Sequence, residues 1–181
     1  NTVNTVIVAG FGSFDSVVNN PASAIAAALN DCVFGNLRIV GREMPVSYAR
    51  SIDVCNMWVE SADAVAILGI GVALERTEVT VESTGARPDP EAREDVDGRP
   101  PPSFDATSPA SVSATWDVER LATLIGANVG DDAGRDVCNA WLYQAVLRLS
   151  VPVAFLHVPP MGVESGKLLS AIHEMWGQCG R

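Results

Sequence analysis

The chain lacks the features that mark several common classes of protein. Its 181 residues include only 12 lysines and arginines against 22 aspartates and glutamates, giving a formal net charge of −10, and the basic residues form no run. Neutralising phosphates requires clustered Lys and Arg, so this composition argues against binding to nucleic acid or to an anionic membrane. No stretch approaches the roughly 20 apolar residues of a transmembrane helix, and no internal repeat or coiled-coil heptad is visible.

Cysteine and histidine are also scarce. The four cysteines are far apart and form no Cys-x-x-Cys pair: Cys32, Cys55, Cys138 and Cys179. This spacing indicates neither a disulfide framework nor a zinc site, and we expect no metal and no cofactor. Residues 1–9 lack the charged opening of a secretory signal, which favours a cytoplasmic protein. Because the chain does not begin with Met, trimming of its start stays open.

Short apolar runs alternate with segments of helical period. A chain of this length fits one domain over residues 1–181, able to bury about 70% of its unfolded surface. The apolar runs, bounded by Gly or Pro, predict buried strands at 5–10, 37–41, 64–69 and 153–157. Helices are predicted at 22–29 (with Asn20 as N-cap and Pro21 at the first position), 48–59, 116–125, 138–149 and 167–176. The alternation predicts a three-layer α/β/α sandwich with a twisted mixed sheet, the layer type of phosphorylases and hydrolases.

Residues 76–82 depart from this pattern because they alternate strictly between polar and apolar. The alternation places Glu82 on a polar face with Glu78, and by itself it is typical of a solvated edge strand. The segment that follows, about 84–109, is rich in Pro, Gly and acidic residues. We expect a long irregular excursion there, which in a compact domain is usually a functional loop or a mobile one.

Cys138 is the most informative residue, because a turn-like segment, 131–134, places its thiol at the predicted start of a helix. The positive end of the helix dipole favours a thiolate, and the unpaired N–H groups of the first turn can bind an oxyanion. Two histidines are available. His157 ends an apolar strand, whereas His173 lies in a helical segment, so His157 is the better candidate base. Each residue alone is also typical of plain packing.

Five separated segments together resemble one family. They are 10–21 (Gly-Phe-x-x-Phe followed by Asn-Pro), 41–46 (Gly-Arg-Glu-Met-Pro-Val), 69–82 (ending in Arg-Thr-Glu and a later Glu), 133–139 (around the Cys) and 155–159 (around the His). In this order the chain resembles pyroglutamyl-peptidase I, also called pyrrolidone-carboxylate peptidase, a family of cysteine peptidases. The resemblance covers roughly half of the chain.

The resemblance implies a catalytic triad of Cys138, His157 and Glu82. Cys138 would attack the carbonyl after the N-terminal residue of a small peptide, His157 would pair with the thiolate and protonate the leaving amine, and Glu82 would orient the imidazole. Phe11 and Phe14 match the aromatic pair that encloses the pyrrolidone ring, although core packing explains them equally well. The resemblance also implies a homo-oligomer.

The chain departs from the family near the predicted pocket. Asp136-Val137 precedes the nucleophile where the family usually has Phe-Val, so a carboxylate replaces an apolar wall; capping of the helix by Asp136 is the simpler alternative. A glutamine after the third strand is absent, and we match the family's Ala-Arg-Ile-Pro-Asp loop to 85–89. Both Asp136 and Val137 are therefore candidate substrate-binding residues.

Four interpretations of function stay open. The first is a cysteine peptidase or amidase that removes an N-terminal pyroglutamyl or related residue through an acyl-cysteine. The second is an acyltransferase in which an amine intercepts the same acyl-cysteine. The third is a non-catalytic module that binds a peptide terminus. A nucleoside phosphorylase of similar layers is the most distant, since no basic phosphate-binding cluster is present.

Overall fold

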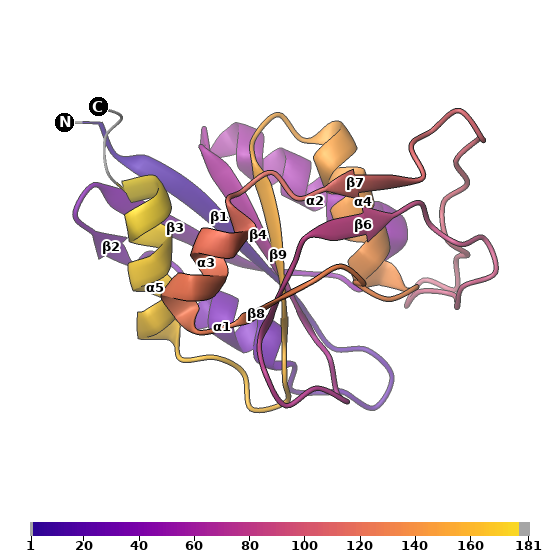
Figure 1. The fold of residues 1–181 in the computed structure, drawn as a ribbon, viewed down its shortest axis with the longest axis horizontal. Coiled ribbons are helices and arrows are strands. Elements are labelled where there is room, and N and C mark those ends of the chain that lie inside the picture. The colour runs from indigo at the N-terminus through magenta and orange to yellow at the C-terminus, as the bar shows by residue number, and fades with distance from the viewer. Residues whose placement is uncertain (1, 178–181) are drawn as a thin grey trace.

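A computed structural model describes residues 2–177 as a mixed β-sheet covered by helices on both faces (Figure 1). The seven strands of the sheet lie in the order β2-β3-β1-β4-β9-β5-β8. Their bounds are β1 Asn4–Phe11, β2 Val33–Phe34, β3 Leu37–Met44, β4 Ala66–Val72, β5 Thr80–Glu82, β8 Asn128–Gly130 and β9 Val153–Val158. Strands β3, β1, β4 and β9 are parallel, whereas β5 runs antiparallel to β9 and β2 antiparallel to β3.

Three helices cover one face of the sheet and two cover the other. The first layer holds α1 (Pro21–Leu29), α3 (Val118–Ile125) and α5 (Ser165–Ile172), which is followed by a short π-helical turn, His173–Gly177. The second layer holds α2 (Tyr48–Ser61) and α4 (Val137–Arg148). The predicted three-layer α/β/α sandwich is therefore confirmed. Within residues 2–177, no helix is both long enough and apolar enough to cross a membrane.

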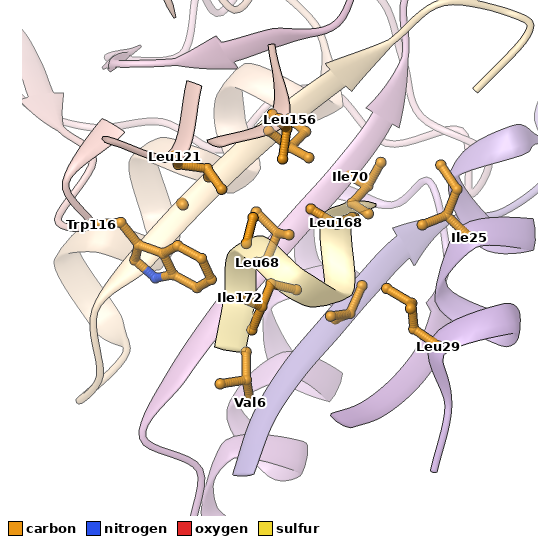
Figure 2. Close-up of a cluster of buried hydrophobic side chains, with 14 of the residues drawn as sticks. Val6, Ile25, Leu29, Leu68, Ile70, Trp116, Leu121, Leu156, Leu168 and Ile172 are labelled. Carbon is orange, nitrogen blue, oxygen red and sulfur yellow. The ribbon is translucent and has the colours of Figure 1, made fainter. Parts of the chain in front are cut away.

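Side chains that alternate along each strand pack into two separate apolar cores, one on each face of the sheet. In β9, Leu156 packs with Leu68, Leu121 and Leu168 in the core beneath α1, α3 and α5 (Figure 2). Its neighbour Phe155 points the other way, into the core beneath α2 and α4. Since successive strand residues face opposite sides, His157 shares the α4 side of the sheet with Phe155.

The predicted helix starts are close to the observed ones. Asn20 caps α1, because its side-chain oxygen accepts a hydrogen bond from the backbone N–H of Ala22 at 2.9 Å. The helix expected from residue 116 begins two residues later, at Val118, because Asp117 caps it by accepting from the N–H of Arg120.

The edge-strand interpretation of residues 76–82 is wrong. Only Thr80–Glu82 form a strand, and it lies inside the sheet between β9 and β8. All three of its residues are buried, and Glu82 has no exposed surface. The predicted alternation does hold within the strand: Val81 packs into the core beneath α3, so Glu82 faces the α4 side.

The segment after β5 leaves the sheet and returns. Thr84–Ala86 (β6) pairs with Ser111–Ser113 (β7) in a separate two-stranded sheet, and residues 87–110 between them contain no helix or strand. Asn139, next to Cys138 on α4, anchors β6 by bonding both the N–H (2.8 Å) and the carbonyl (2.9 Å) of Ala86. The excursion is thereby attached to the helix that carries the thiol.

Candidate active site

Glu82 and His157 meet on the α4 side of the sheet. The imidazole Nδ1 lies 3.0 Å from Glu82 Oε1, and His157 is only 6% exposed. Glu78, the other carboxylate considered from the sequence, is exposed and accepts a hydrogen bond from Asn128 instead. The structure therefore brings Glu82, and not Glu78, to the histidine.

Cys138 approaches the same histidine from α4. It is the second residue of that helix, and its thiol lies close enough to the His157 side chain to raise the pKa of the imidazole. Because Nδ1 is directed to Glu82, Nε2 is the ring atom left for the sulfur. On its other side, the sulfur lies against the backbone of β4, where a Cβ on Gly71 would be only 2.6 Å from it. Gly71 and His157 are direct partners in the β4–β9 register.

The turn that leads into α4 has the predicted form. Asp132 Oδ1 accepts a hydrogen bond from the N–H of Gly134 at 2.9 Å, and Gly134 has a φ of 88°, a conformation that suits glycine. The chain thus turns sharply just before the helix. The first-turn N–H groups of α4 are left at the pocket, where they can bind an oxyanion.

The surroundings of His157 favour its protonated form. Burial alone would lower its pKa, but the interaction with Cys138, and then the hydrogen bond and charge of Glu82, outweigh burial and raise the pKa to about 9. The three side chains are thus arranged for a thiolate–imidazolium pair supported by a buried carboxylate. Cys55, by contrast, is buried, and burial raises the pKa of its thiol to about 12.

A cavity of about 290 Å³ opens in front of the thiol. Its size is at the low end for small-molecule sites. Of the seven site residues predicted from the sequence, six line this cavity: Phe11, Phe14, Asp136, Val137, Cys138 and His157. The seventh, Glu82, lies behind His157.

The substrate-binding candidates occupy distinct places around this cavity. Phe11 is 2% exposed, and the centre of its ring lies 6.4 Å from the centre of the Phe155 ring, so Phe11 belongs to the core as well as to the cavity wall. Phe14 is half-buried. Asp136 is exposed and holds the N-cap position of α4, but its side chain makes no capping hydrogen bond. The capping alternative for Asp136 is therefore wrong in this structure, and its carboxylate is free to face the cavity.

The sequence reasoning missed two parts of the site. Within the excursion after β5, residues 93–96 line the cavity, and residues 85–89, matched to the family's loop on sequence, do not. The dipeptide Ala92-Arg93 was the available signal. Arg76 was also missed as a site residue, although it lies within a matched segment. It lines the cavity and donates to Glu82 Oε1 at 2.7 Å. Among residues 2–177, no group of three or more His, Cys, Asp or Glu side chains could hold a metal ion.

Comparison with known proteins gives one consistent result. A family model described as pyroglutamyl peptidase matches residues 4–164. The pyrrolidone-carboxylate peptidase of Escherichia fergusonii is 27% identical over 168 residues, covering 87% of this chain and 78% of the relative. The protein of the same name from Yersinia pestis (strain Pestoides F) is 26% identical over 166 residues, covering 85% of this chain and 77% of the relative.

Solved structures agree on the fold. Pyroglutamyl peptidase I from Bacillus amyloliquefaciens has a TM-score of 0.81 at 21% identity, with 96% of this chain and 93% of that chain covered. Pyrrolidone carboxyl peptidase from Thermococcus litoralis has a TM-score of 0.79 at 22% identity, with 94% of this chain and 90% of that chain covered.

The family match and the arrangement around the thiol together define a hydrolase of the cysteine peptidase class. More particularly, the chain belongs to the pyroglutamyl peptidase family, which confirms the resemblance inferred from its sequence segments.

Proposed function

We propose that this chain removes an N-terminal pyroglutamyl residue, or a closely related one, from small peptides through an acyl-cysteine at Cys138. The observation that carries the proposal is the continuous chain of contacts from Cys138 through His157 to the buried Glu82, at the edge of a cavity of small-ligand size. The peptidase names of the relatives support it. The same contacts argue against a module that only binds a peptide terminus.

The geometry assigns a role to each atom. Cys138 Sγ, as a thiolate, adds to the carbonyl carbon of the scissile amide, and the oxyanion that forms lies at the first-turn N–H groups of α4. His157 Nε2 gives its proton to the leaving amine, and the C–N bond breaks to leave a thioester. Water then adds to the thioester while Nε2 takes its proton, and the Cys138–acyl bond breaks to release the acid. Glu82 holds Nδ1–H throughout and so fixes the tautomer.

Alkylation of the cysteines tests the nucleophile without a substrate. We expect iodoacetamide to modify Cys138 far faster than Cys32 or the buried Cys55, as mapped by mass spectrometry over time. Cys179 lies outside the described residues, and its labelling rate is measured alongside. The variant Cys138→Ala should lose hydrolysis of pyroglutamyl arylamides and keep its melting temperature. Retained turnover in this variant, or equal labelling of all four cysteines, would contradict the assignment.

The identity of the removed group rests on the cavity wall. Phe11 and Phe14 can enclose a flat ring, whereas the free carboxylate of Asp136 disfavours burial of a neutral lactam unless the lactam N–H or a substrate ammonium pairs with it. A panel of pyroglutamyl and free amino-acyl arylamides separates these two classes. Product analysis with an added amine shows whether water or an amine accepts the acyl group.

We also propose a cytoplasmic homo-oligomer that binds no nucleic acid. A reducing compartment keeps a nucleophilic thiol from forming disulfides, and the net charge of −10 opposes contact with phosphate backbones. The oligomer follows from resemblance to the family. Light scattering coupled to size-exclusion chromatography tests it directly.

A further inference from the structure

Within residues 2–177, Arg76 is the one arginine whose side chain contacts the carboxylate behind the histidine. It lies in the connection between β4 and β5, and its Nη1 donates to Glu82 Oε1 at 2.7 Å. This is the same oxygen that accepts from His157 Nδ1 at 3.0 Å. Arg76 Nη2 also donates to the carbonyl of Asp132 at 3.2 Å, in the turn that leads to Cys138. A single guanidinium therefore contacts both the carboxylate and the nucleophile turn.

The two carboxylate oxygens of Glu82 differ in their partners: Oε1 is shared by Arg76 and His157, whereas Oε2 has none within residues 2–177. Among the residues that the structure describes, Oε2 has no hydrogen-bond partner, and it faces β8, where a Cβ on Gly130 would lie 3.0 Å away. Glu82 itself is fully buried. A carboxylate in such a place loses its hydration, and opposite charges and hydrogen-bond donors at close range offset that loss. His157 cannot supply that charge throughout, since its imidazole must give up a proton during the reaction.

We propose that Arg76 is a positioning residue for the reaction: its fixed positive charge pairs with the Glu82 carboxylate while His157 alternates between its charged and neutral forms, and so holds Nε2 toward Cys138. This inference rests on the proposed function for the meaning of turnover, but the charge arrangement itself can be tested on the thiol alone. Among the described residues, Arg76 from the β4–β5 connection contacts Glu82, and Cys138 from α4 lies beside His157, while β8 faces Glu82 with Gly130. Further charged residues line the cavity in front of His157: Asp15, Glu75, Arg93, Glu94, Asp95, Arg135 and Asp136.

A permanent positive charge lowers the proton affinity of every group near it. Removing the guanidinium should therefore favour the protonated forms of Glu82, His157 and Cys138 together. The acid limb of the activity profile, and the midpoint of Cys138 alkylation against pH, should both move to higher pH. If Arg76 serves only to hold the turn at Asp132 through its hydrogen bond, its loss should lower the rate of hydrolysis at every pH. The midpoints of the activity profile and of Cys138 alkylation should then stay in place.

Four variants separate charge from hydrogen bonding. Arg76→Met removes both, Arg76→Gln keeps an N–H donor without the charge, and Arg76→Lys keeps the charge with a different geometry. The matched control is Arg148→Met, which breaks another arginine–carboxylate pair, Arg148 with Asp53, at an exposed place on α4 far from its first turn. Each variant is checked for folding by circular dichroism. Hydrolysis of a pyroglutamyl arylamide and the iodoacetamide reaction of Cys138 are then measured across pH.

We expect Arg76→Met and Arg76→Gln to move both midpoints up by about 1 pH unit. Their kcat should fall about 10–100-fold, because His157 is then held less well toward Cys138. Arg76→Lys and Arg148→Met should keep the parent midpoints. If Arg76→Met does not fold, the Gln and Lys variants decide between the two roles.

Midpoints that stay in place when Arg76→Gln is folded would overturn the proposal, as would a shift in Arg76→Lys equal to that in Arg76→Gln. If the parent protein does not cleave pyroglutamyl arylamides, the proposed substrate is wrong. The alkylation midpoints still test Arg76 in that case, because they require no substrate.

Discussion

The absence of a side chain at Gly71 should be as important for turnover as the catalytic side chains. A Cβ built at this position would lie 2.6 Å from Cys138 Sγ and 3.0 Å from the ring of Phe155, whereas ordinary contacts are 3.4–4 Å. In Gly71→Ala the sulfur must therefore retreat by about 1 Å, and a displacement of that size can cost roughly 10²-fold in rate. Alternative thiol rotamers would turn Sγ away from His157 and cost at least as much.

Gly69→Ala is the matched variant for stability. Residue 69 lies two positions earlier on the same face of β4, and the atoms nearest to a Cβ there belong to the rings of Trp141 and Phe155. Overpacking of this kind costs about 1–3 kcal/mol of unfolding free energy. We expect Gly69→Ala to lower the melting temperature while keeping kcat within about threefold, since the triad atoms are not displaced.

The assay compares kcat on a pyroglutamyl arylamide, the rate of Cys138 alkylation and the melting temperature in both variants. A further control, Gly166→Ala, adds a methyl in the first turn of α5, where only the flexible Glu164 carboxylate lies nearby at 3.2 Å. It should leave all three quantities near the parent values. A folded Gly71→Ala protein with kcat within about threefold of the parent would refute the steric argument.

Other side chains of the site should give separable outcomes. Glu82→Gln should lower kcat about 10²- to 10⁴-fold, whereas Glu78→Gln should leave it within about twofold. The reverse pattern would show that Glu78, and not Glu82, is the carboxylate of the triad. The pKa of His157 is raised from 6.5 to about 9, so its ion-pair stabilisation is fully present below 6.5 and is lost as pH rises through about 9. The parent's melting temperature should therefore fall more across that range than that of His157→Asn, and equal slopes would contradict this. Asp136→Phe should raise kcat/KM for pyroglutamyl arylamides at an unchanged melting temperature; a lower melting temperature without a gain would restore the capping role.

The layers of the fold could be predicted because the buried strands and the helices each have a recognisable pattern of apolar residues within a short stretch of the sequence. Residues 5–10, for example, are apolar throughout, as expected for a strand covered on both faces, and β1 covers Asn4–Phe11. The N-cap at Asn20 follows from the side-chain chemistry of a single residue and its proline neighbour. These elements depend on near neighbours in the chain, which is the information that a single sequence contains.

The extent and place of β5 could not be predicted in the same way. Its outer partner β8 is Asn128-Val129-Gly130, a tripeptide with no strand signature of its own, so no local pattern indicated that Glu82 would be enclosed. The loop at 93–96 was missed for a related reason. It is held at the cavity by distant contacts, such as the hydrogen bond from the Tyr48 N–H to Asp95 at 2.8 Å across 47 positions of the chain. Only the tertiary structure joins such partners.

The register between β5 and β9 decides whether a triad exists at all. Thr80 is opposite His157 and Glu82 is opposite Phe155, so Glu82 lies diagonally across from the histidine, two positions along and on the same face. Long side chains reach across that diagonal. A slip of one residue would turn Glu82 toward the core beneath α3 and leave Val81 at the histidine. A three-residue strand fixes its register poorly by its own hydrogen bonds, so β8 on one side and the Arg76–Glu82 ion pair at the end of β5 stabilise the productive register.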